Sequence, residues 1–267
     1  MATVPIKISS PSTREFWEIP VLFEDEQLLA IDKPARLLTS PDRDDPARPS
    51  LMYLLHAGIR DGKPWATARD LQHLANAQRL DFETSGVLLL AKTKPALIQL
   101  ANILSTEKPV HDYLALVQGN PAEKLFEANA PIGVHPQQVS RMVVDREAGK
   151  KARTTFEVLE SFRGYALLRC RPVTPRKHQI RIHLRHLHLP VVGDELYLGK
   201  PLLLSTIKAS YRLKPGRTER PLIETAALHA VRLELPHPAS GDPVVIESPR
   251  PRELQVALKY LRLHAAV

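Results

Sequence analysis

The continuous apolar run at residues 86–92 (GVLLLAK) constrains the fold more than any other segment of this chain. The run is short, lacks alternating polar positions and follows a polar segment, so it predicts a buried strand. A buried strand requires a sizeable core. A chain of 267 residues is long enough to provide one, either as one large domain or as two smaller ones.

Further strands are predicted where short apolar or alternating runs stand between turn signals. Residues 21–34 are typical of a hairpin with a polar turn at 24–27. The other predicted strands cover residues 113–118, 155–159, 165–171, 228–235 and 244–247. Residues 39–49 and 200–221 are rich in Pro or charge and are predicted to be loops.

Helical spacing of apolar residues predicts four helices. A short one covers residues 71–77, and a second begins near Pro95. A third covers residues 177–187, with Thr174 as its N-cap and Pro175 in its first turn. The fourth closes the chain, with one apolar face formed by Leu254, Ala257, Leu258 and Leu261. Strands and helices mix without regular βαβ alternation, which favours the α+β class.

Composition excludes several classes of protein. Hydrophobic residues make up 43% and charged residues 25%, as in soluble globular proteins. No apolar run approaches the ~20 residues that span a bilayer, and the start MATVPIKISS lacks the apolar core of a secretion signal. The single cysteine, Cys170, excludes an intramolecular disulfide and a Cys-rich zinc site. We therefore expect a soluble cytoplasmic protein, with residues 1–19 forming an N-terminal arm.

The net charge of +8 is concentrated in one segment. Residues 141–186 carry twelve Lys or Arg and four Asp or Glu, so the rest of the chain is close to neutral. A local basic excess suits a polyanion such as nucleic acid, because bound phosphates release their counterions. A solvated basic face without a partner is the alternative.

The polar residues before the apolar run form the sharpest candidate site. They place Asp81 where a rigid strand could hold its carboxylate at the mouth of a cleft. In the plainer interpretation, Asp81 or Thr84 only caps a turn. Asp81 and Glu83 also resemble the paired carboxylates of a glycosidase, but close sequence neighbours rarely reach opposite sides of one bond.

Other side chains give weaker signals. The histidines cluster at positions 178, 183, 186 and 188, yet they alternate with Arg181 and Arg185, whose charge opposes a metal cation. Ser85 lacks the nucleophile elbow of a hydrolase. Cys170 lies between two arginines, which point to the opposite face of a strand, so we expect a buried structural thiol.

Three segments in order resemble the RluA-type family of RNA pseudouridine synthases. Residues 78–92 (QRLDFETSGVLLLAK) are similar to the family's H-R-L-D-x-x-T-S-G pattern. Residues 177–197 (KHQIRIHLRHLHLPVVGDELY) and 228–238 (LHAVRLELPHP) resemble its H-Q-I-R and L-H-A patterns. The similarity covers about residues 20–250. The chain departs from the family at five positions, in these patterns or elsewhere in the matching region, namely Arg36, Gln78, Asp112, Pro175 and Lys177.

The resemblance implies a fold and a reaction. The fold would be a mixed, mainly antiparallel central sheet flanked by helices and loops, with a basic active-site cleft, in one catalytic domain at residues 20–267. No separate N-terminal RNA-binding domain is expected. The chain would isomerise uridine in ribosomal or transfer RNA without a cofactor or metal. RNA is the expected partner, no membrane is involved, and the protein is expected to be a monomer.

The resemblance also assigns residues. Asp81 is implied as the catalytic carboxylate, Arg181 as its partner, and Tyr113 as the residue that stacks on the target base. Arg79 is implied to fill the place that the flipped base leaves, and Ile180 to line the wall beneath that base. The full set of expected RNA-binding residues is Arg79, Thr84, Lys92, Arg176, Lys177, His178, Gln179 and Ile180. The alternatives are a catalytically weak RNA-binding or RNA-folding protein and a sugar-bond hydrolase that uses Asp81.

Overall fold

A computed structural model describes residues 4–42, 45, 47–214 and 216–267. The chain divides into two compact units. Unit 1 consists of Met1–His111 and Ala230–Pro249, and unit 2 of Asp112–His229 and Arg250–Val267.

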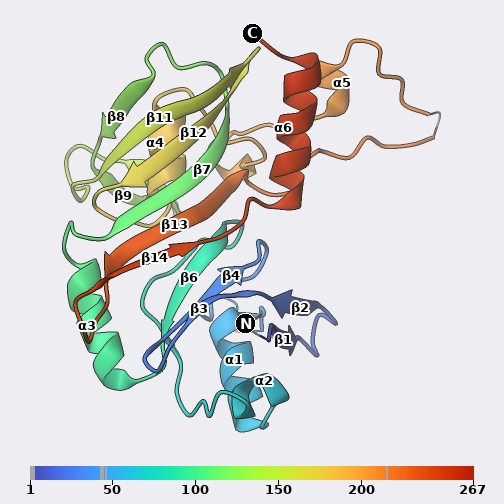
Figure 1. Cartoon of the computed structure of the whole chain (residues 1–267). Helices are drawn as coiled ribbons and strands as arrows, with labels where there is room; N and C mark the ends of the chain where they lie inside the picture. Colours follow the sequence, from blue (N-terminus) through green and yellow to red (C-terminus); the bar gives the residue numbers. More distant parts are fainter. Residues whose placement is uncertain (1–3, 43–44, 46, 215) are drawn as a thin grey trace. The chain divides into compact units, whose positions relative to one another are not determined.

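The sheet of unit 1 is built around the predicted buried strand. In it, β3 (Val21–Glu24), β4 (Leu28–Lys33), β6 (Ser85–Ala91) and β13 (Leu228–Pro236) lie in this order (Figure 1). Two short strands extend it, β5 (Ala75–Asn76) on β6 and β14 (Pro243–Glu247) on β13. From Gly86 to Ala91, every residue of β6 is buried. The predicted strand and the predicted 21–34 hairpin are both confirmed.

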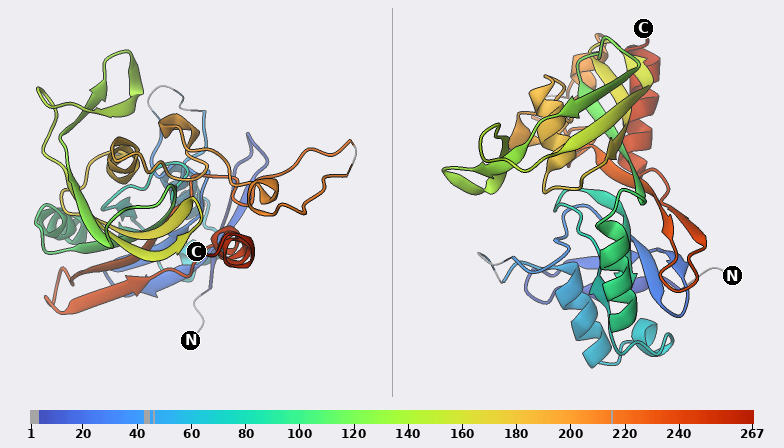
Figure 2. Two further views of the ribbon diagram at one scale, coloured as in Figure 1. Left: turned by 90° about the horizontal axis from the view of Figure 1, so that it is seen from above. Right: turned by 90° about the vertical axis from the view of Figure 1, so that its left-hand side faces the viewer.

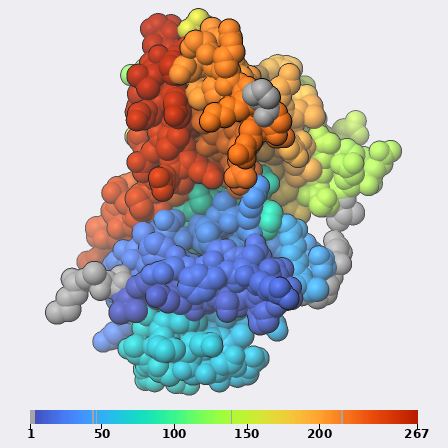
Figure 3. All heavy atoms as spheres, turned by 90° about the vertical axis from the view of Figure 1, so that its right-hand side faces the viewer, coloured from blue at the N-terminus to red at the C-terminus, as the bar shows by residue number. Residues whose placement is uncertain are grey.

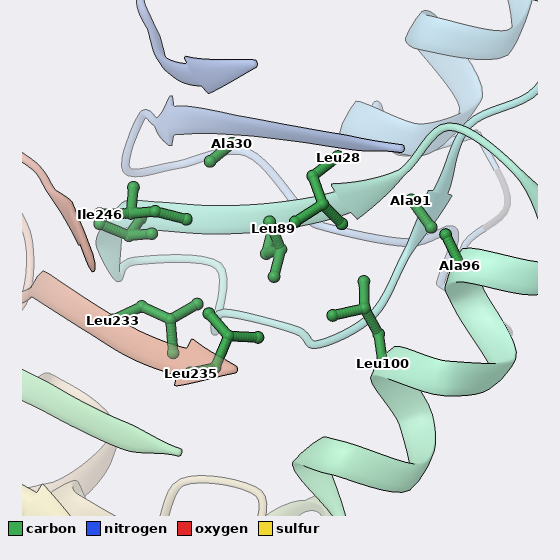
Figure 4. Packing of buried hydrophobic residues seen from close by; sticks show 10 residues of the cluster. Leu28, Ala30, Leu89, Ala91, Ala96, Leu100, Leu233, Leu235 and Ile246 are labelled. Carbon is green, nitrogen blue, oxygen red and sulfur yellow. The ribbon is translucent and has the colours of Figure 1, made fainter. Parts of the chain in front are cut away.

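One face of this sheet packs on the helix predicted after Pro95. That helix is α3 (Lys94–Leu104), which Thr93 caps by accepting a hydrogen bond from the Ala96 amide. Figure 4 shows Leu100 of α3 directed toward leucines of the strands and Ala96 lying beside Ala91. The remaining residues of this core are Leu28, Ala30, Val87, Leu89, Ala91, Leu233, Leu235 and Ile246.

Two predictions for unit 1 need correction. The predicted helix at 71–77 is absent, because Asp70 has a positive φ of 48° and the following chain leads into β5. Helices lie earlier instead, at α1 (Leu51–Arg60) and α2 (Pro64–Thr67). The expected arm contains an antiparallel hairpin, β1 (Ile6–Ser9) with β2 (Phe16–Ile19), shown in dark blue in Figure 3.

The sheet of unit 2 is fully antiparallel. Its order is β7 (Val110–Gln118), β12 (Tyr165–Pro172), β11 (Arg153–Phe162) and β8 (Leu125–Asn129). The strands predicted at 113–118, 155–159 and 165–171 are confirmed. A hairpin that was not predicted, β9 (Ile132–His135) with β10 (Gln138–Val144), projects from this sheet in Figure 2.

The helices of unit 2 are α4 (Gln179–His186), the one-turn η1 (Glu195–Tyr197), α5 (Leu204–Ile207) and α6 (Arg252–His264). The predicted apolar face of α6 is confirmed, since Leu254, Ala257, Leu258 and Leu261 are all buried. The predicted start of α4 is wrong. Thr174 Oγ1 accepts from the Arg153 amide at 3.0 Å instead of capping a helix, and α4 begins after His178, whose φ is +57°.

No helix among the described residues is long and apolar enough to cross a bilayer.

Candidate active site

Asp81 lies in unit 1 in a turn that is fixed on both sides. The Thr84 amide donates to the Asp81 carbonyl at 3.1 Å, so the backbone itself closes the turn. The preceding residue is held by buried Thr39, whose Oγ1 donates to the Leu80 carbonyl at 2.9 Å and lies 3.2 Å from the Leu80 amide. Two local constraints therefore position the backbone that carries the Asp81 carboxylate.

The strand that follows Asp81 requires glycine at its start. Gly86 has a φ of +112°, and a Cβ there would lie 2.2 Å from the Ala230 carbonyl oxygen. No side chain fits between these two strands at that point. The close approach fixes the end of β6 nearest to Asp81 against β13.

Lys33 is a buried cation near Asp81 that the sequence analysis did not assign to the site. Its side chain is fully buried, and its Nζ donates to the carbonyls of Pro34 and Leu37, each at 2.7 Å. Burial lowers the pKa of Lys33 to about 7, while attraction to Asp81 and Asp32 opposes that shift. One feature of the sequence could have identified Lys33 as a site residue. It is a lysine at the end of a predicted strand, directly before a proline.

Two arginines lie next to the residues that flank Asp81. Arg79 is exposed beside buried Leu80. The guanidinium of Arg48 lies 3.9 Å from the ring centroid of Phe82, within the range of a cation–π contact. Arg79 in sequence and Arg48 in space are therefore neighbours of the residues that flank Asp81.

Arg181 is held firmly in unit 2. Its Nε and Nη2 donate to the two carboxylate oxygens of Asp194, each at 2.7 Å, and Asp194 is fully buried. Its guanidinium also lies 4.9 Å from the ring centroid of Tyr197. Bidentate pairing fixes the plane of a guanidinium as well as its position. The predicted pairing of Arg181 with Asp81 joins residues of different units and stays a prediction.

Tyr197 connects three segments of unit 2. Its hydroxyl accepts from the Met142 amide at 3.0 Å and lies 2.7 Å from His178 Nδ1. The Met142 amide can only donate, so the tyrosine oxygen accepts there, whereas the donor in the contact with His178 depends on the histidine tautomer. The β9–β10 hairpin, the start of α4 and Arg181 thus meet at one buried ring. Asp194 and Tyr197 both lie in the motif at residues 177–197, where no sequence pattern assigns either of them a role.

Tyr113 lies on β7, half-buried and paired in register with Cys170 of β12. Its neighbour Asp112 is buried and forms an ion pair with Arg171 at 2.5 Å. Cys170 is fully buried, as expected, and burial raises the pKa of its thiol, so it is not a reactive nucleophile.

The expected RNA-binding residues divide by exposure. Arg79, Arg176 and Lys177 are exposed, whereas Thr84, Gln179 and Ile180 are buried. Gln179 Nε2 donates to the Arg153 carbonyl and to Thr154 Oγ1, both at 2.9 Å.

Lys92 also has partners inside unit 1. Its Nζ lies 3.2 Å from Glu24 Oε1 and donates to the Asp25 carbonyl at 2.8 Å. The structure therefore gives Lys92 a role in tying β6 to the β3–β4 turn. Whether this residue and the others of the set also bind RNA stays a prediction.

His183 has a structural environment. Gln179 Nε2 donates to Thr154 Oγ1, so the Thr154 hydroxyl is free to donate to His183 Nδ1 at 2.8 Å. His183 Nε2 then donates to the Ala130 carbonyl at 2.9 Å. This chain of hydrogen bonds selects the neutral ring with its proton on Nε2. In the described part of the chain, no group of three or more metal-ligating side chains is placed to hold an ion.

We expect His183 to make the protein less stable in mild acid. Burial lowers the pKa of His183 below its usual 6.5, and nearby His186 adds to that effect. The unfolded chain therefore takes up the proton first, so the contribution of His183 to stability is constant above its usual pKa and falls below it, by at most ~1.4 kcal/mol per pH unit. Urea unfolding at a series of pH values measures this slope. In His183→Gln the slope should be shallower, and an unchanged slope would contradict the assignment.

Comparisons with known proteins agree on one family. A family model described as RNA pseudouridylate synthase matches residues 27–186. A protein of Xanthomonas campestris called ribosomal large subunit pseudouridine synthase D is 37% identical over 251 residues, covering 92% of this chain and 70% of the relative. Relatives of the same name from Nitrosomonas europaea and Salmonella typhimurium are 39% and 32% identical, over 91% and 90% of this chain and 65% and 70% of their own lengths.

Solved structures show the same fold. Human RNA pseudouridylate synthase domain containing 4 superimposes with a TM-score of 0.66 at 24% identity, over 91% of this chain and 92% of the other. Human RNA pseudouridylate synthase domain containing 1 gives 0.64 at 23% identity, over 90% and 87%. The expected α+β fold with a mainly antiparallel sheet and flanking helices is confirmed.

Proposed function

The chain belongs to the RNA pseudouridylate synthase family, and we propose that its substrate is RNA of the large ribosomal subunit, with Asp81 as the catalytic carboxylate. The enzyme is an isomerase that acts on RNA. The ribosomal target is favoured by the relatives named above, whose own names specify that subunit.

The observation that carries the proposal for Asp81 is the constrained turn before β6. A catalytic carboxylate works best when its backbone cannot move and its charge is balanced. Thr39 and Thr84 fix the backbone on either side, and buried Lys33 interacts electrostatically with Asp81. These features favour a functional site over a simple capped turn.

The reaction breaks the N1–C1′ bond of uridine and forms a C5–C1′ bond. The uracil turns between the two steps, C5 loses its proton and N1 gains one, so no oxidant and no external group is consumed. The target base leaves its stack before Asp81 can reach it. Asp81 acts in the ionised form, either as nucleophile or by assisting the departure of uracil.

Tyr113 and Arg181 complete the proposed site. The flat ring and phenol of Tyr113 suit stacking on the base and proton transfer. Arg181 is oriented by Asp194, so that its charge is presented in a fixed direction. Exposed Arg79 is suited to fill the vacated place in the RNA stack. A single catalytic domain, a basic active-site cleft, a cytoplasmic location and a monomeric state remain part of the proposal.

Pseudouridine mapping tests the ribosomal target. We expect large-subunit RNA from cells that lack this protein to lose pseudouridine at one or a few positions, and the gene on a plasmid to restore them. Small-subunit and transfer RNA from the same cells are the controls. Loss confined to transfer RNA would contradict the proposed target. If no position changes in any RNA, the catalytically weak RNA-binding alternative is favoured.

A further inference from the structure

A second concentration of positive charge lies in unit 2, outside the 141–186 segment. Residues 208–220 (KASYRLKPGRTER), called the basic loop here, follow α5 and hold five cations and one acid. In Figures 1 and 2 the orange segment that contains this loop extends outward beside α6. Four of its cations are exposed, namely Arg212, Lys214, Arg217 and Arg220.

The exposed cations of the basic loop are not neutralised by the protein. Elsewhere in unit 2, arginines pair with acids, as Arg169 does with Glu157 and Arg262 with Glu160. Among the described residues, no ion pair involves the four exposed cations of the loop. Glu219 is the one acid of the loop. It lies at the base of the loop, where its Oε1 accepts a hydrogen bond from the Ser205 amide at 2.9 Å. Clustered like charges repel, so the arrangement favours binding of a polyanion.

The base of the loop is fixed, so the cations are presented at a defined place. The Leu222 amide donates to the Leu202 carbonyl at 2.8 Å, which joins the two ends of the segment. Leu202 and Ile223 are buried, and the Glu224 amide donates to Glu253 Oε2 of α6 at 3.2 Å. Long loops with anchored ends are usually functional.

We propose that the basic loop binds RNA phosphates outside the nucleotide that is modified, and so increases the affinity for long substrates. This inference rests on the proposed function. RNA is favoured over a lipid surface, because a membrane-bound segment needs an apolar face. Among the loop's described residues, Leu213 is the large apolar side chain that is exposed.

The test compares RNA binding by three proteins. The loop variant replaces Arg212, Lys214, Arg217 and Arg220 by Gln. The control variant removes the same charge by replacing four exposed lysines elsewhere by Gln, namely Lys63, Lys94, Lys108 and Lys259. Their Kd values for a transcript of large-subunit RNA are measured over a range of salt concentrations, alongside wild type.

We expect the loop variant to bind about 10- to 100-fold more weakly than wild type at low salt. The slope of log Kd against log salt should fall by about 0.7 for each phosphate that the loop no longer neutralises, while the control variant changes little. Equal weakening in both variants would show a nonspecific charge effect and overturn the proposal. Unchanged RNA binding by the loop variant would also overturn the proposal. This holds even if the loop variant no longer binds vesicles of anionic phospholipid.

Turnover separates this inference from the proposed function. The loop variant should raise KM for pseudouridine formation on the long transcript and leave kcat unchanged. On a short RNA that contains only the target uridine and its nearest neighbours, it should match wild type. If wild type forms no pseudouridine in the transcript, the proposed function fails, while the Kd comparison still decides whether the loop binds RNA.

Discussion

Asp81→Asn should abolish pseudouridine formation, lowering the rate by at least about 10³-fold, because an amide is neither a nucleophile nor a base. The side chain keeps its shape, and the turn at Asp81 is closed by the backbone. We therefore expect the Kd for RNA and the unfolding midpoint to stay close to those of wild type. Single-turnover assays with saturating RNA measure the chemical step separately from binding.

Glu83→Gln is the matched control. It makes the same change of carboxylate to amide two residues away, and it should keep most of the activity. If both variants were inactive, a pair of carboxylates as in a glycosidase would become the better interpretation. If Asp81→Asn were active, the assignment of the catalytic residue would be wrong.

The parts of the fold that could be predicted from sequence are those set by local pattern. The apolar run that became β6 is buried along its length, and helical spacing correctly placed the buried face of α6. Asp81 became a candidate because it stands in the polar segment that precedes β6, and its catalytic role stays a prediction. In each case the residues close in sequence carry the information.

The errors arose where distant contacts override a local pattern. Thr174 and Pro175 have the spacing of a helix start, but the Thr174 hydroxyl is taken by the amide of Arg153 on β11. The chain then reaches α4 only after His178 adopts a left-handed conformation. No local pattern contains the hydrogen bond that draws Thr174 away.

The same limit applies to the candidate site. Lys33 interacts electrostatically with Asp81 from another strand, and Tyr197 gains its role from contacts with Met142 and Arg181. A sequence shows such residues only as members of a motif. Their function becomes visible when the side chains are brought together.

Asp194→Asn should separate the role of the Arg181 pair in catalysis from its role in folding. Asp194 is fully buried, and its two carboxylate oxygens accept from Arg181. Neutralising it removes the bidentate carboxylate partner of a buried guanidinium, which costs about 3 kcal/mol or more of unfolding free energy. Loss of the fixed orientation should lower kcat about 100-fold, with little change in the Kd for RNA.

A double variant distinguishes these two effects. Asp194→Asn combined with Arg181→Gln replaces the ion pair by two neutral amides, so it removes the buried cation that lost its carboxylate partner and should recover part of the lost stability. Activity should not recover, because the cation itself is gone. Chemical unfolding and single-turnover rates are measured for wild type, Asp194→Asn, Arg181→Gln and the double variant, which together form a double-mutant cycle. If activity recovered along with stability, Asp194 and Arg181 would serve the fold alone. Another residue would then have to support Asp81, and Lys33 would be the next candidate.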